Sequence, residues 1–246
     1  MIETRGIGKR FADRWALREA SLKVAPGDFL GVLGRNGAGK TTLIRLLTGQ
    51  MRPTEGSVRI QGLDPGTVPM ALRGLVGIMP EEGALLEDLG GSQYLHFVGQ
   101  LHGLDRLALG ARICELQDCL QVDFRRDCPI RDYSYGMKKK LAFSAAILHG
   151  PKLLFLDEPF EGLDPDVVRT LLELLGNLWT RGVTIVMTSH QLSLAERLCT
   201  RVLLVEEGRV VLEGPSAELI GKEEDLEGLF LRVVGRKTKA GSLSWM

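Results

Sequence analysis

Glycines, a lysine and hydroxyl residues near the start of the chain have the spacing of a phosphate-binding loop. Gly37 and Gly39 let successive backbone N–H groups turn inward around an anion, and Lys40 can neutralise the β- and γ-phosphates of a nucleotide. Thr41 is placed to give its hydroxyl to Mg²⁺. The nucleotide contacts expected from this run are Gly34, Asn36, Gly37, Ala38, Gly39, Lys40, Thr41 and Thr42.

Two acidic residues follow an apolar run far downstream. Residues 153–156 read Leu-Leu-Phe-Leu, which is typical of a buried strand, and Asp157 and Glu158 come directly after it. Asp157 is the candidate Mg²⁺ ligand, and Glu158 is the candidate base that takes a proton from an attacking water. An isolated acidic pair at a strand end is more often a solvated turn or cap, but the phosphate loop upstream favours the catalytic interpretation.

The elements that must position these groups have an α/β pattern. The apolar run 29–33 precedes the loop and residues 41–47 follow it with helical periodicity, so strand, loop and helix occur in the required order. Helical stretches separate three further apolar runs, as parallel buried strands require. These runs are residues 153–156, 183–187 and 202–205.

The remaining segments suggest additional strands and a helical block. Residues 1–30 hold short strand-like pieces, and 56–60 and 75–79 read as further strands that we expect to pair antiparallel beside the nucleotide. From Ser92, a candidate N-cap, to about residue 122 the apolar residues recur at helical spacing. A terminal hairpin is expected around 206–209.

Composition limits the classes of partner. The chain has 31 basic and 31 acidic residues and a formal net charge of zero, which argues against nucleic acid as the main partner. It contains no apolar run of about 18 residues, and its first residues lack the apolar segment of a signal peptide, so we expect a cytosolic protein. Residues 236–246 are rich in Lys, Gly and Ser and are expected to be loosely held.

A further motif lies between the loop and the acidic strand. Residues 133–140, Tyr-Ser-Tyr-Gly-Met-Lys-Lys-Lys, resemble the signature motif of ATP-binding cassette (ABC) proteins, usually written LSGGQ. The resemblance extends to the order of phosphate loop, Q-loop, signature, Walker B strand, D-loop and switch histidine, over about residues 1–235. The chain looks most like the ATP-binding subunit of an export-type ABC transporter, in which ATPase and permease are separate chains.

The resemblance implies roles for several residues. Ser134 and Gly136 match the signature positions that contact the γ-phosphate held by the opposite subunit. His190 matches the switch histidine that contacts the γ-phosphate and orients the water, although a lone histidine at a strand end is ordinarily structural. Asp164 is the acidic member of the D-loop, which packs across the dimer. Glu81 takes the Q-loop position and is implied to act in hydrolysis and as a ligand of Mg²⁺ or water.

The chain departs from the family pattern in places. Tyr135 replaces the first glycine of the signature and must point outward if the backbone is to reach phosphate, and Met137 replaces glutamine. Glu81 replaces the expected glutamine and adds negative charge near the phosphates, so hydrolysis could be slowed or tuned. The lysines at 138–140 are interpreted as a solvated helix face rather than a basic recognition patch.

The adenine requires an aromatic platform. Phe11 fits the stacking aromatic of the family's A-loop and is the expected contact, and Trp15 is the rival. Either ring could instead belong to the core.

These observations predict an α/β P-loop NTPase of the ABC ATPase type, spanning 1–235, with an N-terminal antiparallel β portion and a helical subdomain inserted at about 86–145. The resemblance implies that ATP and Mg²⁺ are its cofactors, that two subunits, identical or different, enclose two ATP molecules, and that a transmembrane permease is its partner. The protein would then be cytoplasmic and held at the inner face of the cell membrane. The alternatives are a regulatory module that binds ATP without useful turnover and a soluble ABC ATPase outside transport.

Overall fold

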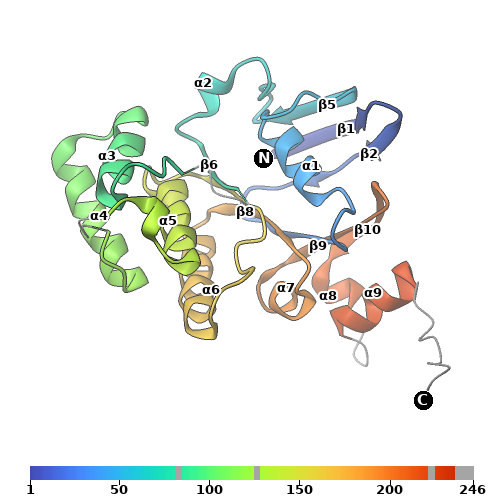
Figure 1. Ribbon diagram of the computed structural model, residues 1–246. Coiled ribbons are helices and arrows are strands. Elements are labelled where there is room, and N and C mark those ends of the chain that lie inside the picture. Colours follow the sequence, from blue (N-terminus) through green and yellow to red (C-terminus); the bar gives the residue numbers. More distant parts are fainter. Residues whose placement is uncertain (81–84, 125–127, 221–224, 236–246) are drawn as a thin grey trace, which may run out of the picture.

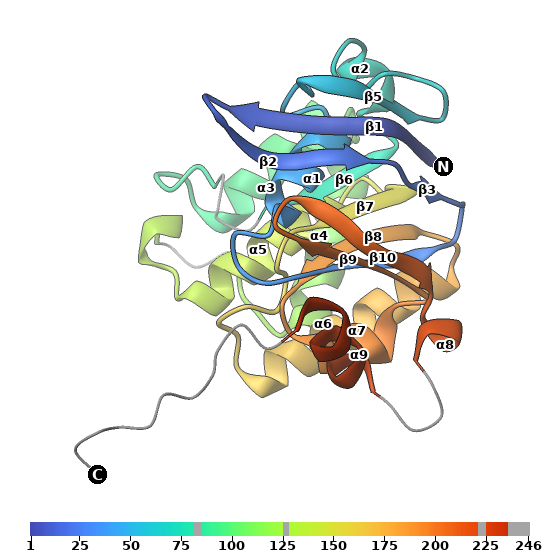
Figure 2. The same cartoon turned by 90° about the vertical axis from the view of Figure 1, so that its right-hand side faces the viewer.

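The structure, a computed structural model, describes residues 1–80, 85–124, 128–220 and 225–235. A six-stranded sheet lies at the centre of the molecule, with a smaller antiparallel sheet on one side and helices on the other (Figure 1). The turned view in Figure 2 shows the two sheets as successive layers, with α6, α7 and α9 beneath the larger one. The predicted α/β fold class is confirmed.

The smaller sheet is built from N-terminal strands. Strand β1 (Ile2–Phe11) pairs with β2 (Arg14–Ala20), β3 (Lys23–Val24) and β5 (Glu55–Ile60), in each case antiparallel. The predicted N-terminal antiparallel portion is therefore confirmed for these strands.

The larger sheet has the strand order β10-β9-β4-β8-β7-β6. Neighbouring strands run parallel except that β10 is antiparallel to β9, with which it forms the expected terminal hairpin. Strands β4 and β7 are buried at every position, and for this reason they read as continuous apolar runs. The bounds are β4 (Phe29–Leu33), β6 (Val76–Met79), β7 (Leu153–Leu156), β8 (Thr184–Ser189), β9 (Arg201–Glu206) and β10 (Arg209–Pro215).

The expected pairing of residues 75–79 was wrong. We predicted an antiparallel strand beside the nucleotide, but β6 forms the edge of the larger sheet and runs parallel to β7, with Met79 opposite Leu156. The physical reason is that an apolar run of this length can pair in either direction, and only the chain's return through the helical block fixes which one.

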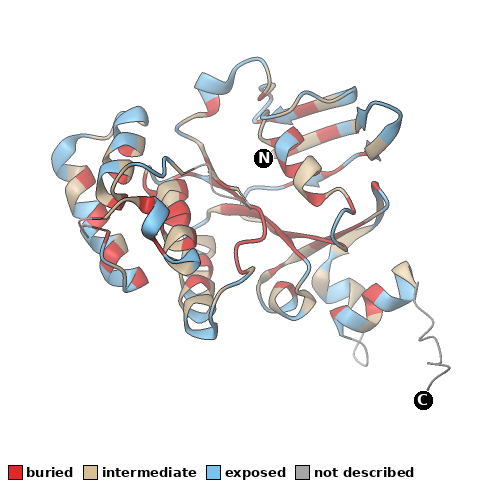
Figure 3. Cartoon of the chain, viewed as in Figure 1, coloured by how far each residue is buried: buried red, intermediate tan, exposed pale blue. Residues whose placement is uncertain are grey.

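The helix after the phosphate loop lies between the two sheets. Helix α1 (Lys40–Leu47) buries Leu43, Ile44 and Leu46 in a hydrophobic cluster that also contains residues of β1, β2, β4 and β7. A second cluster on the opposite face of the larger sheet is covered by helices, and Figure 3 shows the resulting buried band along the sheet. These covering elements are α6 (Pro165–Thr180), α7 (Leu192–Leu198), α8 (Ser216–Leu219) and α9 (Leu226–Val234).

Three helices stand at one side of the larger sheet (Figure 1). They are α3 (Gly91–Leu101), α4 (Arg106–Leu120) and α5 (Tyr135–Ile147), preceded in the chain by the short α2 (Pro69–Leu72), and a single 3-10 turn, η1 (Ile130–Asp132), leads into α5. They share a hydrophobic cluster of their own. Helix α3 begins at Gly91 and its N-cap is Gly90, two residues before the predicted N-cap Ser92. None of the helices in the described residues has the length and apolarity that a membrane crossing needs.

Candidate nucleotide-binding site

The phosphate loop connects β4 to α1 and is held tightly at both ends. A Cβ atom on Gly34 would lie 2.3 Å from the carbonyl oxygen of Val205, and one on Gly39 would lie 2.5 Å from that of Ala16, so neither position accepts a side chain. Gly39 also has φ of 114°, a left-handed conformation that favours glycine. Backbone crowding therefore explains these two glycines.

Lys40 lies at the start of α1 with its side chain only 6% exposed. Its Nζ donates to the carbonyl oxygens of Gly34 at 2.9 Å and Arg35 at 3.3 Å, and it lies 3.1 Å from Oε1 of Glu158. The loop lysine and the acid after β7, separated by more than a hundred residues in sequence, therefore lie next to each other in the fold.

Glu158 lies where three functional segments meet. Its Oε2 accepts hydrogen bonds from the backbone N–H of His190 at 3.3 Å and lies 3.0 Å from His190 Nδ1. Its Oε1, buried beside Lys40, has no other hydrogen-bond partner among the described residues. The carboxylate thus keeps an acceptor atom directed at the place where the phosphate loop ends, which suits a base for an incoming water.

Asp157 is 2% exposed and is fixed by its neighbours in the sheet. Its backbone N–H donates to Met79 at 2.9 Å, and its Oδ1 accepts from the Thr188 hydroxyl at 2.5 Å. Thr188 Oγ1 also accepts the backbone N–H of Glu158 at 2.9 Å, so one hydroxyl on β8 orients both acids. Sequence reasoning did not single out Thr188; its position two residues before His190 on a buried strand was the available signal.

The oxygen donors at this edge fit Mg²⁺. Asp157 and Thr41 follow parallel strands of one sheet, β7 and β4, at their carboxyl ends, and carboxylate and hydroxyl oxygens are the ligands that this ion prefers. The described residues contain no group of three or more His, Cys, Asp or Glu suited to a metal.

A cavity of about 710 Å³ opens beside the phosphate loop. Phe11 and Trp15 both line it, together with Asn36 and Gly37 of the loop. Phe11 is 49% exposed and has one cation over its ring, Lys9 Nζ at 5.6 Å from the centroid. The Trp15 ring is approached by two guanidinium groups, Arg10 at 5.7 Å and Arg18 at 5.3 Å from its centroid. Phe11 therefore presents more free ring surface for a base.

The signature residues lie at the start of α5. Ser134 is the N-cap, and its hydroxyl accepts from the backbone N–H of Met137 at 3.3 Å. Among the described residues, no hydrogen bond or ion pair joins Ser134 to Lys40, Glu158 or His190. Gly136 faces Leu163 of the D-loop, and Asp164 is the N-cap of α6 without a side-chain cap bond. Within the described part of the chain, Ser134 and Gly136 therefore contact α5 and the D-loop.

The structure changes the interpretation of the lysines at 138–140. The lysines at 138–140 do not form a solvated face: Lys139 is 4% exposed, because the phase of α5 turns this position toward Glu158, and Lys140 donates to the carbonyl of Leu120 at 2.7 Å. Lys138 is partly exposed and pairs with Glu87 at 2.7 Å. Glu81 and the tail 236–246 lie outside the described residues.

Fold and site together define a P-loop ATPase with a signature helix, and comparison with known proteins identifies its family. Residues 17–161 match the ABC transporter family, and the chain belongs to it. It is an ABC ATPase, the ATP-binding subunit type of that family.

Two curated relatives are similar over most of this chain. The daunorubicin resistance ATP-binding protein DrrA3 of Streptomyces coeruleorubidus is 38% identical over 89% of this chain and 69% of its own length. The Nod factor export ATP-binding protein I of Cupriavidus metallidurans is 35% identical over 91% of this chain and 74% of its own. A solved ATP-binding subunit of an ABC transporter superposes with a TM-score of 0.88 at 27% identity, covering 95% of this chain and 99% of that one.

Proposed function

We propose that the chain binds ATP with Mg²⁺ and hydrolyses it, with Glu158 as the base. The observation that carries this proposal is the placement of the Glu158 carboxylate between Lys40 at 3.1 Å and His190 at 3.0 Å. Lys40 neutralises the β- and γ-phosphates, and His190 contacts the γ-phosphate and orients the attacking water. Phe11 stacks on the adenine.

Asp157 and Thr41 would hold Mg²⁺, with Glu81 as the further predicted ligand of the ion or of its water. When bound, the ion supplies charge neutralisation for the β- and γ-phosphates. The Thr188 hydroxyl keeps the Asp157 carboxylate in place, because it donates to Oδ1 and leaves Oδ2 free to turn toward the ion.

A second subunit completes the site. Ser134 and Gly136 lie at the exposed start of a 13-residue helix, where a hydroxyl, backbone N–H groups and the helix dipole favour an anion. Because they do not reach the phosphate loop of their own chain, they serve the loop of a partner chain, and Asp164 packs across that interface. ATP then closes a dimer and hydrolysis opens it.

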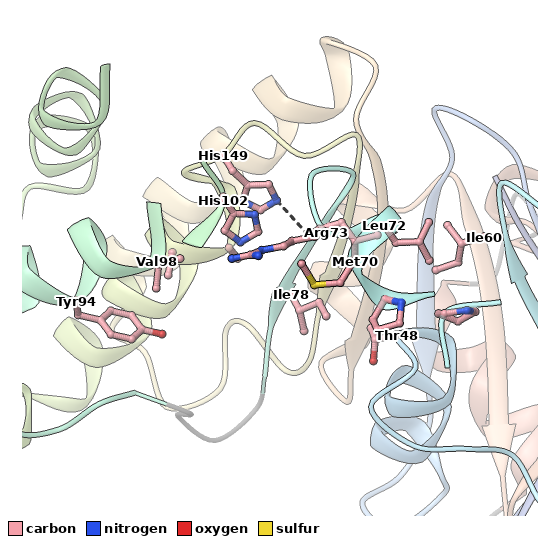
Figure 4. Close-up of a pocket in the computed structure, with 15 residues that line it drawn as sticks. Thr48, Ile60, Met70, Leu72, Arg73, Ile78, Tyr94, Val98, His102 and His149 are labelled. Carbon is pink, nitrogen blue, oxygen red and sulfur yellow. Dashed lines mark hydrogen bonds between the residues drawn. The ribbon is translucent and has the colours of Figure 1, made fainter. Parts of the chain in front are cut away.

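The permease partner is proposed to dock at the junction of the α3–α5 group with the larger sheet. A cavity of about 380 Å³ lies there (Figure 4). Its lining comes from both sides of the junction: Met70, Arg73, Ile78, Tyr94, Val98 and His149. A permease segment bound in this cavity would be displaced whenever the α3–α5 group moves relative to the larger sheet. Closure of the ATPase dimer would in this way be transmitted to the permease.

The occupant that suits this cavity is a cytoplasmic segment of the permease with an apolar face and an acidic group near Arg73. Met70 is apolar, 70% exposed and part of the cavity lining, so it offers such a segment an apolar contact at the rim. The chain is then a cytoplasmic ATPase held at the inner face of the membrane by its partner, and it powers export. The partner, and not this chain, selects the cargo.

The test is coexpression with a chain of about six apolar spans encoded by a neighbouring reading frame. We expect the ATPase to sediment with membranes only when this chain is present, and Met70→Arg to release it. Leu107→Arg, at an exposed apolar position on α4 away from the cavity, is the matched control and should stay bound. Wild-type protein that remains in the supernatant with the candidate permease would contradict the transport assignment and favour a regulatory or soluble ATPase.

A further inference from the structure

The backbone at Glu158 has an unusual conformation. Its φ is +47°, in the left-handed region that non-glycine residues rarely adopt. Such a conformation persists only when neighbouring contacts hold it. The backbone N–H of Glu158 donates to the Thr188 hydroxyl at 2.9 Å, which holds one side of this residue's backbone in place.

The carbonyl oxygen of Glu158 accepts a hydrogen bond from Nζ of Lys139 at 3.0 Å and a longer one from the backbone N–H of Glu161 at 3.4 Å. Lys139 is 4% exposed, so this charged donor works in a site largely shielded from water, where a hydrogen bond is strong and its loss is costly. Lys139, a buried lysine on the signature helix α5, therefore holds the backbone of Glu158, whose side chain faces the phosphate loop.

The same lysine is linked to the start of α5 and to the D-loop. Its Nζ lies 5.6 Å from the ring centroid of Tyr135, one helical turn earlier on the same face. The Tyr135 ring in turn covers Gly162, which has φ of +67°, and a Cβ there would lie 2.8 Å from the ring. Tyr135 is 50% exposed yet packs against this loop, so it does not simply point outward.

We infer that Lys139 is a positioning residue for hydrolysis: it fixes the Glu158 backbone and couples it to Tyr135 and the D-loop. This inference rests on the proposed role of Glu158 as base. Because Ser134 lies at the end of the same helix, a contact made there with the partner's nucleotide is passed through Lys139 to this chain's own base. The two ATP sites of a dimer are thereby linked.

The experiment compares ATP turnover in Lys139→Met with that of the wild type. Methionine keeps the apolar stem and removes the donor. We expect kcat to fall by about tenfold or more while KM and the directly measured ATP affinity change by less than about twofold, since the phosphate loop is untouched. Lys138→Met, one residue away in the surface pair with Glu87, is the matched control and should keep the wild-type rate.

A conservative replacement and a double mutant separate positioning from folding. Lys139→Arg keeps a charged donor that also stacks on Tyr135 and should recover most of the rate. In a Glu158→Gln background, Lys139→Met should change the residual single-turnover rate by less than about twofold, because the base on which it acts is gone. If Lys139→Met does not fold, Lys139→Gln, whose stem is too short to reach the carbonyl, takes its place with the same expectation.

Two results would overturn the inference while leaving the proposed function intact. One is a wild-type kcat in folded Lys139→Met together with a strong loss in Glu158→Gln. The other is an equal loss from Lys139→Met in both backgrounds, which would mean that the lysine acts on the fold alone. A wild-type rate in Glu158→Gln would instead refute the base itself, and with it the proposed mechanism.

Discussion

Lys40 and Glu158 form an ion pair of 3.1 Å in which each side chain is only 6% exposed. Both groups are also the ones proposed to act on the nucleotide, the first on its phosphates and the second on the water. ATP must therefore draw the Lys40 ammonium partly away from the carboxylate. Binding of the phosphates and release of Glu158 for catalysis are consequently one event.

Replacing Lys40 with Ala is expected to abolish most binding and turnover. The phosphates lose their main counter-charge, so ATP affinity should fall by about 10- to 100-fold, the effect of one or more charge-assisted hydrogen bonds. Isothermal titration with ATP and a phosphate-release assay measure the two effects. Lys152→Ala, at an exposed lysine before β7, is the control.

The same substitution should also lower Tm, because it leaves the Glu158 carboxylate buried without its partner. Adding Glu158→Gln should restore part of the loss, since a neutral amide needs no counter-charge. Unchanged ATP affinity and turnover in folded Lys40→Ala would refute the phosphate-loop assignment.

Glu158→Gln separates binding from chemistry. The amide keeps the size of the side chain but cannot take the proton, so turnover should fall by about 10²- to 10⁴-fold while ATP still binds. The protein should then accumulate as a nucleotide-bound dimer, which light scattering with MgATP detects. A variant that stays monomeric at high concentration and hydrolyses ATP at the wild-type rate would contradict both the base and the two-subunit site.

The residues that do chemistry were predictable because their signals are local. The phosphate loop needs its glycines and lysine at fixed spacing, and Asp157 and Glu158 follow directly on a buried apolar run. Their meeting across the sheet could be inferred because parallel strands bring their carboxyl ends to one edge.

Other features depend on pairing and helix phase, which are not local. An apolar run such as 75–79 carries no information about the direction of its partner, and the antiparallel prediction for it failed. Three consecutive lysines look solvated, yet the 100° step between residues on a helix buries Lys139 and lets Lys140 donate to the carbonyl of Leu120. Both lysines donate to backbone carbonyls, which have no signature in the sequence.

Ser134→Arg tests whether the signature serves a partner subunit. The bulky side chain should block ATP-driven dimerisation and lower turnover, whereas ATP affinity of the isolated subunit should stay within about twofold because Lys40 lies in a separate half-site. Mixing this variant with Glu158→Gln should give heterodimers with at most one competent site. Wild-type dimerisation and turnover would remove Ser134 from the functional residues and favour the regulatory-module alternative.

The adenine platform is tested by paired substitutions. Phe11→Ala should weaken ATP binding by about tenfold, given that stacking of a base on an aromatic ring is worth about 1–3 kcal/mol. Trp15→Ala should have a smaller effect, because the Trp15 ring is already contacted by Arg10 and Arg18. Titration with a fluorescent ATP analogue distinguishes the two, and the reverse order of effects would assign the platform to Trp15.

Acid stability should depend on a histidine pair at the junction cavity. His149 stacks on His102 with ring centroids 3.8 Å apart, and burial, together with the nearby His102 and Arg112, lowers the pKa of His149 to about 4 from its ordinary 6.5. Between pH 6.5 and about 4, His149 is protonated in the unfolded chain but stays neutral in the folded chain. Stability contributed by neutral His149 is therefore complete above pH 6.5 and is lost as the pH falls toward 4.

His149→Gln removes this proton uptake while its amide can still donate to the Val76 carbonyl, which His149 Nε2 contacts at 3.1 Å. The Tm of the wild type should consequently fall more steeply than that of His149→Gln between pH 6.5 and 4, with parallel curves above pH 6.5. Thermal unfolding followed by circular dichroism gives both curves. Parallel curves over the whole range would show that the folded chain accepts this proton as readily as the unfolded one.

The position of β4 in the larger sheet has a consequence for synthesis of the protein. This strand supports the phosphate loop and is made early, but its neighbours on both sides are β8 and β9, residues 184–189 and 201–206. Because the ribosome releases the chain from its N-terminus, β4 waits as an unpartnered apolar segment until most of the polypeptide has emerged. A nascent chain stalled before β8 would contain every residue of the phosphate loop, but the strand that supports the loop would lack both of its neighbours. We expect chaperones to bind the chain during this interval.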